Sequence, residues 1–216
     1  MATPTLPKMA RASDIIDRLM ALKGERLLVG ELLSGLHERA FGLAITLLVL
    51  PNCLPVPSIP YLSTVTGVPI LLLATQLLLG RPMPWLPQRI GRWGAPRARL
   101  GRFWRRVRPG VIKVERILQP RLLNLTEPRA ERALAAVIML LAFILTLPLP
   151  FANLLPAWGI LLLALGITER DGHVVIAGLF ATVLALCWVA ALILAGSYLA
   201  GLTGEAWLWL RQTLGL

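Results

Sequence analysis

Two proline-rich stretches contain the polar residues with the clearest chemical potential in this sequence. Asn52 and Ser58 lie in the first stretch, residues 51–60, and Asn153 lies in the second, residues 148–156. Gly67 follows the first stretch and Gly159 follows the second. Each glycine is expected to begin a half-helix whose unpaired N–H groups and partial positive charge attract an anion. The pattern predicts a binding site made by Asn52, Ser58, Gly67, Asn153 and Gly159.

Charged residues stand at the ends of the long apolar blocks, where each marks the passage to polar sequence. Such residues either form a polar site or mark the points at which helices leave the lipid, and the second interpretation is the commoner one. We therefore expect boundary charges, with a binding role as the alternative, at Glu38, Arg39, Arg81, Glu131, Arg132, Glu169, Arg170 and Asp171.

Nucleophiles and metal ligands do not form a recognisable motif. Cys53 and Cys187 lie inside apolar blocks, which is typical of small buried residues. His37 and His173 have neither a cysteine nor a second histidine nearby. No Ser-His-Asp or Cys-His arrangement, phosphate loop or pair of carboxylates within an apolar block is visible. The sequence predicts no enzyme, no metal site and no cofactor.

The composition is that of a membrane protein. Hydrophobic residues make up 56% and charged residues 15% of the chain, whereas a soluble domain has roughly 45–50% and 25%. No charged residue occurs over residues 40–80 or 133–168, and residues 173–204 are also uncharged if His173 is neutral. Apolar stretches longer than about 18 residues are typical of membrane segments, because lipid offers no partner to a buried charge. We predict an all-α integral membrane protein. Residues 1–39 carry charge throughout, so insertion by internal segments is expected instead of a secretory signal.

The chain contains two copies of one unit. Glu38-Arg39-Ala40 recurs 93 residues later as Glu131-Arg132-Ala133, and a Pro-x-Pro follows each tripeptide at the same interval. The run at residues 70–74 recurs 90 residues later. Each copy has an apolar helix, a proline-rich break and a second apolar helix, because proline removes a backbone donor and disfavours helix in the residue before it. The predicted broken hairpins are residues 41–80 and 133–171.

The helices expected in these hairpins are short. At a rise of about 1.5 Å per residue they would cover roughly 15–22 Å, against a hydrocarbon core near 30 Å. Each unit is therefore either a re-entrant hairpin with its proline tip near the midplane, or a pair of crossings completed by irregular chain packed in protein. Both geometries pair the two tips and bring the boundary charges to one face. A homodimer that seals the short helices from lipid is a further expectation.

Most of the net charge of +11 lies in the connector, residues 81–132, which has fourteen basic and three acidic residues. This excess predicts a cytoplasmic loop that contacts anionic lipids, and it leaves no need for a nucleic-acid partner. Residues 1–40 are expected on the same side, with an amphipathic surface helix over residues 13–23 that begins at Ser13 as its cap. Residues 172–203 are predicted to cross the membrane, and residues 204–216 to form an interfacial tail.

Three runs of the sequence together resemble the ExoD-type exopolysaccharide synthesis family of bacterial inner-membrane proteins. They are Pro51-Asn-Cys-Leu-Pro-Val-Pro-Ser-Ile-Pro60, then Ile70-Leu-Leu-Leu-Ala-Thr-Gln-Leu-Leu-Leu-Gly-Arg81 with Pro84-Trp-Leu-Pro87, and Pro148-Leu-Pro150 leading to Leu163-Ala-Leu-Gly-Ile-Thr-Glu-Arg-Asp-Gly172. The resemblance implies an inner-membrane location and a link to exopolysaccharide production, but no particular reaction. Two hypotheses follow: binding or translocation of an anionic lipid-linked species, such as a polyprenyl phosphate, at the paired tips, or a non-transporting scaffold or regulator of a polysaccharide synthesis complex.

Overall fold

The computed structural model describes residues 13–14, 16–17, 26–28, 30, 36, 39–54, 62–85, 94–147 and 152–214. Within these residues the regular structure is helical apart from two short antiparallel strands, β1 (Arg26–Leu28) and β2 (Gly94–Pro96). The predicted all-α class is confirmed. The helices are α3 (Ala40–Val49), the 3-10 helix η2 (Leu50–Cys53), α4 (Leu62–Leu78), α6 (Arg97–Ile117), the 3-10 helix η3 (Leu123–Thr126), α7 (Pro128–Thr146), α8 (Leu154–Glu169) and α9 (Gly172–Leu214).

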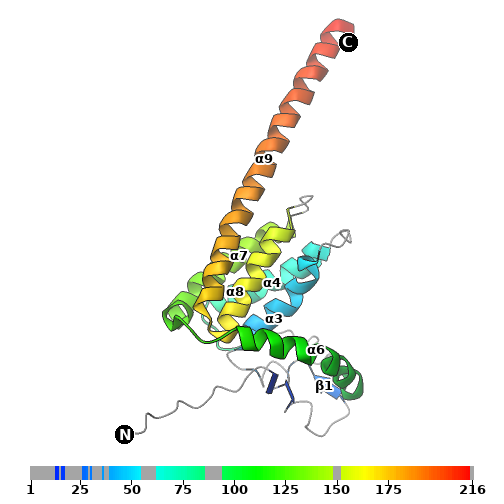
Figure 1. Ribbon diagram of the computed structural model, residues 1–216. Coiled ribbons are helices and arrows are strands. Elements are labelled where there is room, and N and C mark those ends of the chain that lie inside the picture. The colour runs from blue at the N-terminus through cyan, green and yellow to red at the C-terminus, as the bar shows by residue number, and fades with distance from the viewer. Residues whose placement is uncertain are drawn as a thin grey trace, which may run out of the picture.

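Helices α3, α4, α7 and α8 pack into a bundle, and the first part of α9 packs against α8 (Figure 1). Helix α4 lies against α7, and α3 lies against α8. The core side chains recur at helical spacing, as Phe41, Ile45 and Val49 do along α3, so each helix turns one face inward. The largest fully buried side chains of the other three helices are Ile70, Ile138, Leu141, Leu145, Ile160 and Leu163.

Two glycines bring pairs of helices unusually close together. A Cβ atom at Gly42 of α3 would overlap Thr168 Oγ1 of α8 and would lie 2.8 Å from the carbonyl oxygen of Ala164. A Cβ atom at Gly67 of α4 would lie 2.8 Å from Thr146 Cγ2 of α7. Glycine allows such close approach between helices because it has no Cβ atom. The pairs α3–α8 and α4–α7 are therefore held by backbone-to-side-chain packing.

Two bundle helices, α4 and α7, are longer than the sequence predicts. Helices α4 and α7 each begin five residues before their expected starts at residues 67 and 133. At about 1.5 Å per residue they measure roughly 25 and 28 Å, close to the thickness of a hydrocarbon core. The expected starts were wrong because proline is tolerated at the first helical position, where Pro128 stands, and because α4 continues through Pro69.

Helices α4 and α8 end in the same way. Gly80 and Arg170 both have left-handed backbone, with φ of 71° and 52°. In each case the following amide donates a hydrogen bond to the carbonyl five residues earlier, at 3.1 and 3.0 Å. This arrangement is the Schellman C-cap, which satisfies the last carbonyls of a helix. The two caps are 90 residues apart, the same interval as the repeated run at residues 70–74.

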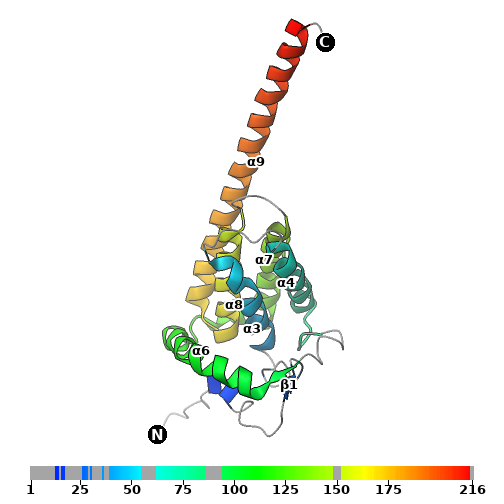
Figure 2. The same cartoon turned by 90° about the vertical axis from the view of Figure 1, so that its right-hand side faces the viewer.

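Helix α9 extends over 43 residues and projects well beyond the bundle in both views (Figures 1 and 2). Its segment Gly172–Tyr198 is, among the described residues, the one helix long and apolar enough to cross a membrane. Large apolar side chains point outward along it, including Phe180 and Leu194, which are 66% and 69% exposed. The helix continues to Leu214 through residues that the sequence suggested as an interfacial tail.

Helix α6 lies across the end of the bundle that is opposite the projecting end of α9 (Figures 1 and 2). Ser13 and Asp17 of the N-terminal region are attached to it. Both the backbone N–H and the hydroxyl of Ser13 donate to the buried carboxylate of Glu115, at 2.8 and 2.6 Å. Hydrogen bonds from Arg108 and Trp104 lower the pKa of the Asp17 carboxyl. The remainder of the helix predicted over residues 13–23 lies outside the described residues.

Candidate functional site

The two predicted tips touch at residues that the structure describes. Asn153, which precedes α8, donates from Nδ2 to Ser63 Oγ in α4 at 2.9 Å. Asn52, in η2, donates from Nδ2 to Thr66 Oγ1 in α4 at 2.7 Å. Both asparagines therefore hold the start of α4, one from each hairpin. The Oδ1 atom of Asn153 is buried and has no hydrogen-bond partner among the described residues.

Two glycines of the predicted site have a different structural role. Gly67 and Gly159 were expected to open half-helices, but each is the sixth residue of its helix, α4 or α8. That prediction was wrong because both helices begin before the glycine. A Cβ atom at Gly159 would lie 2.9 Å from Leu141 Cδ1, so this glycine also permits close packing. Ser58, the fifth residue of the predicted site, lies outside the described residues.

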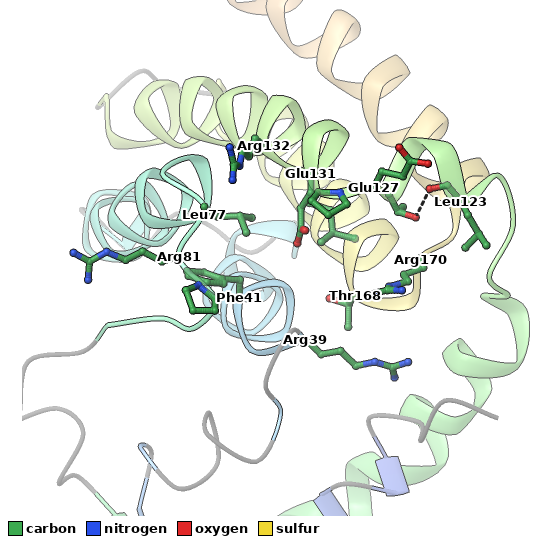
Figure 3. Close-up of a pocket in the computed structure, with 15 residues that line it drawn as sticks. Arg39, Phe41, Leu77, Arg81, Leu123, Glu127, Glu131, Arg132, Thr168 and Arg170 are labelled. Atoms are coloured by element: carbon green, nitrogen blue, oxygen red, sulfur yellow. Dashed lines mark hydrogen bonds between the residues drawn. The ribbon is translucent and has the colours of Figure 1, made fainter. Parts of the chain in front are cut away.

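The boundary charges come together at the opposite end of the hairpins, around a cavity of about 390 Å³ (Figure 3). Helices α3 and α7 begin there, and α4 and α8 end there. The buried apolar side chains of Phe41, Leu77 and Ile167 are part of the lining of the cavity. Five of the eight predicted boundary charges line it: Arg39, Arg81, Glu131, Arg132 and Arg170.

Two arginines occupy equivalent positions on the two sides of this cavity. Arg39 and Arg132 are 93 residues apart in the repeated tripeptides, and each lies against the end of a helix from the other hairpin. The guanidinium group of Arg132 packs on Gly80, where a Cβ atom would lie 2.6 Å from Nη2. Arg39 Nη1 lies 3.7 Å from Glu169 Oε1 at the end of α8. A cation beside a helix C-terminus is stabilised by the helix dipole, which favours both placements.

The electrostatic balance of the cavity is positive. Its lining contains four arginines and two glutamates, and cations remain in excess when Glu169, the partner of Arg39, is included. Figure 3 shows Glu131, Thr168 and Arg170 around the middle of the cavity, with Arg39, Arg81 and Arg132 toward its edges. Among the described residues no three His, Cys, Asp or Glu side chains come together as metal ligands would. The arrangement is suited to recognition of an anion.

Asp171, the last predicted boundary charge of the second hairpin, has structural contacts. Its buried carboxylate accepts the backbone N–H of His173 at 3.0 Å through Oδ1, which caps the start of α9. The other oxygen, Oδ2, accepts the backbone N–H of Gln119 at 3.0 Å. Asp171 therefore fixes the end of the connector to the junction between α8 and α9. Glu38 lies outside the described residues.

Comparison with known proteins supports the resemblance seen in the sequence. Residues 12–191 match the family described as "Exopolysaccharide synthesis, ExoD". The chain belongs to the ExoD family. It is 38% identical over 185 residues to Protein ExoD of Rhizobium meliloti (strain 1021), a match that covers 83% of this chain and 76% of that protein. It is 31% identical over 166 residues to an uncharacterized protein of Synechocystis sp., covering 75% and 76%. No solved structure matches this ExoD-family chain.

Two polar lining residues in the connector were not predicted from the sequence. Glu127 stands at the N-cap of α7 and Thr126 precedes it, both on the wall formed by the connector. A signal was present, because Glu127-Pro128 places an acidic residue and a proline where a helix characteristically starts. If this helix start had been recognised in the sequence, the predicted second hairpin would have included Glu127.

Proposed function

We propose that the chain is a multi-pass inner-membrane protein that acts in exopolysaccharide synthesis and binds an anionic lipid-linked species. The apolar outer surface of the bundle is the observation that supports a location in the membrane. Large hydrophobic side chains are exposed on every bundle helix as well as on α9: examples are Leu47, Val65, Leu72, Phe143, Trp158 and Phe180. Soluble monomers rarely expose continuous apolar surface on this scale, whereas lipid covers it without cost.

The proposed topology uses the two helix pairs as two copies of one hairpin. Helices α3 and α4 form the first copy, and α7 and α8 form the second. Their matched C-caps, their equivalent arginines and the touching tips support a twofold relation between the copies. Since each hairpin goes in and returns, both copies keep the same orientation, and the axis lies along the membrane normal. Helix α9 then crosses alone and carries the C-terminal end to the other side.

The basic connector sets the orientation. Arginines and a lysine are exposed along α6, whose acidic residue Glu115 is buried against Ser13. Basic residues beside membrane helices are retained in the cytoplasm and attract anionic lipids. We therefore place α6, the cavity and the N-terminal region at the cytoplasmic face, in contact with anionic lipids.

Cysteine labelling tests this topology. In a variant without Cys53 and Cys187, Arg97→Cys should react with a membrane-impermeant maleimide only after the cells are permeabilised. Leu214→Cys, at the end of α9, is the matched control and should react in intact cells. Labelling of Arg97→Cys in intact cells would contradict the orientation, and a protein that fractionates with the soluble extract would contradict membrane integration.

A scaffold or regulator of a polysaccharide synthesis complex is the alternative function. The hydrogen bonds at the tips favour it, because the Nδ2 donors of Asn52 and Asn153 are occupied by Thr66 and Ser63. Deletion of the gene followed by complementation separates the two functions. A scaffold that acts through its connector would lose polysaccharide production on replacement of the α6 arginines, whereas a binding protein would lose it on replacement of residues between the hairpins.

A further inference from the structure

We infer that the cavity at the charged end of the hairpins is a binding site for a phosphate group, with Arg39 and Arg132 as its paired ligands from the two repeats. That this phosphate group belongs to a lipid-linked molecule rests on the proposed function. Recognition is thereby placed at the cavity, and the proline tips are left as the contact that joins the hairpins.

The donor capacity of Arg39 is the first reason. Its side chain is 17% exposed, and Nη1 is buried with no hydrogen-bond partner among the described residues. Glu169 lies 3.7 Å away, which is an ion-pair distance but too long for a hydrogen bond. A buried cationic donor without a hydrogen bond is costly, and buried polar groups almost always have a partner. An oxyanion in the cavity would supply the missing acceptor.

The chemistry of the rim is the second reason. Arg132 and Arg81 make no hydrogen bond or ion pair with another described residue, and both are exposed at the edge of the cavity. Guanidinium groups present planar pairs of N–H donors that match the oxygens of phosphate, and such charge-assisted bonds are stronger than neutral ones. Phosphate has several oxygens and can therefore accept from more than one arginine.

The shape of the cavity is the third reason. Its volume of about 390 Å³ lies within the range of small-molecule sites, roughly 300–1,000 Å³. Besides the arginines, its lining includes the buried apolar side chains of Phe41, Leu77 and Ile167. A lining that combines arginines with apolar side chains fits a head group whose phosphate meets the arginines while an attached apolar portion contacts the apolar residues.

Binding measurements on the full-length protein test the site. Inorganic phosphate is titrated into protein in detergent, and polyprenyl phosphate into protein in nanodiscs, with phosphatidylglycerol as a phosphodiester of ordinary membranes. Arg132→Gln is compared with Arg129→Gln, which removes the same charge one turn earlier on α7 at an exposed position that does not line the cavity. Arg39→Lys keeps the charge toward Glu169 but removes the planar donor pair.

We expect Arg132→Gln and Arg39→Lys to weaken phosphate binding by about 10–100-fold, the loss of a charged hydrogen-bonding pair, and Arg129→Gln to leave it unchanged. If the arginine variants weaken the binding of polyprenyl phosphate but not of inorganic phosphate, the phosphate group belongs to a lipid. If they weaken only the binding of inorganic phosphate, it belongs to a soluble phosphate compound. Equal losses in Arg132→Gln and Arg129→Gln, or no saturable binding of either probe, would overturn the site. Failure here leaves membrane integration intact, because the labelling experiment tests that separately.

Discussion

Replacement of Gly42 by alanine should loosen the contact that forms one wall of the cavity. The new Cβ atom would overlap Thr168 Oγ1 and lie 2.8 Å from the carbonyl oxygen of Ala164. Rotation of Thr168 relieves only the first clash, because the second involves backbone of α8. Thr168 Oγ1 also donates to that same carbonyl at 2.7 Å, which opposes its rotation. Helices α3 and α8 must therefore separate, and Arg39 would move away from Glu169.

The magnitude follows from two opposing effects. Overpacking of a well-packed contact costs about 1–3 kcal/mol, whereas Gly→Ala in a helix gains about 1 kcal/mol of propensity. We expect a net loss of about 1–2 kcal/mol because the backbone clash cannot be relieved by a rotamer change. For a chain of this size each kcal/mol lowers the unfolding midpoint by roughly 2–4 °C. Thermal unfolding in detergent should thus show a decrease of about 2–8 °C.

Gly101→Ala in α6 is the matched control. A Cβ atom at Gly101 meets nothing within 4 Å, so only the propensity gain remains. This variant should be stabilised by about 0.5–1 kcal/mol. The reasoning is refuted if Gly42→Ala is as stable as the wild type, or if both glycine variants shift in the same direction. The double variant Gly42→Ala with Thr168→Ala should recover part of the loss, because it removes one of the two clashes.

Three further predictions address the other contacts. Asp171→Ala should destabilise the protein by about 2–4 kcal/mol, measured by thermal unfolding, since two backbone amides lose a buried carboxylate; a change below 0.5 kcal/mol or so would contradict its capping role. Asn52→Leu and Asn153→Leu should each cost about 1 kcal/mol of stability, measured in the same way, because each variant loses a hydrogen bond to α4; wild-type stability of both variants would contradict the view that the two asparagines hold the start of α4. The ion pair between Asp17 and Arg108 should persist in mild acid. Because the pKa of the Asp17 carboxyl in the folded protein is below the ordinary value of 3.8, the ion pair stabilises the fold above about pH 4, and this stabilisation is lost only as the pH falls through the lowered pKa. Hydrogen exchange of residues 13–17 checks this, and loss of protection near neutral pH would refute it.

Much of the helical architecture was determined by the sequence itself. Charge-free blocks predicted the all-α class because buried backbone in an apolar chain must bond to itself, and the prolines near residues 51–60 and 148–156 separated the helices of each pair. The 93- and 90-residue intervals also predicted equivalent positions, which the matched caps at Gly80 and Arg170 now occupy. These features depend on local backbone chemistry and on composition, which a single sequence contains.

Only the tertiary structure decided which polar residues meet. The sequence placed anion recognition at the tips because Gly67 and Gly159 were expected to open helices there, but both helices begin five residues earlier, so these glycines are packing contacts. It also treated Arg39 and Arg132 as charges at a lipid boundary. Their convergence around one cavity depends on the close approach of α3 to α8 and of α4 to α7. That approach is set by side-chain packing between segments about a hundred residues apart, which no local pattern in the sequence specifies.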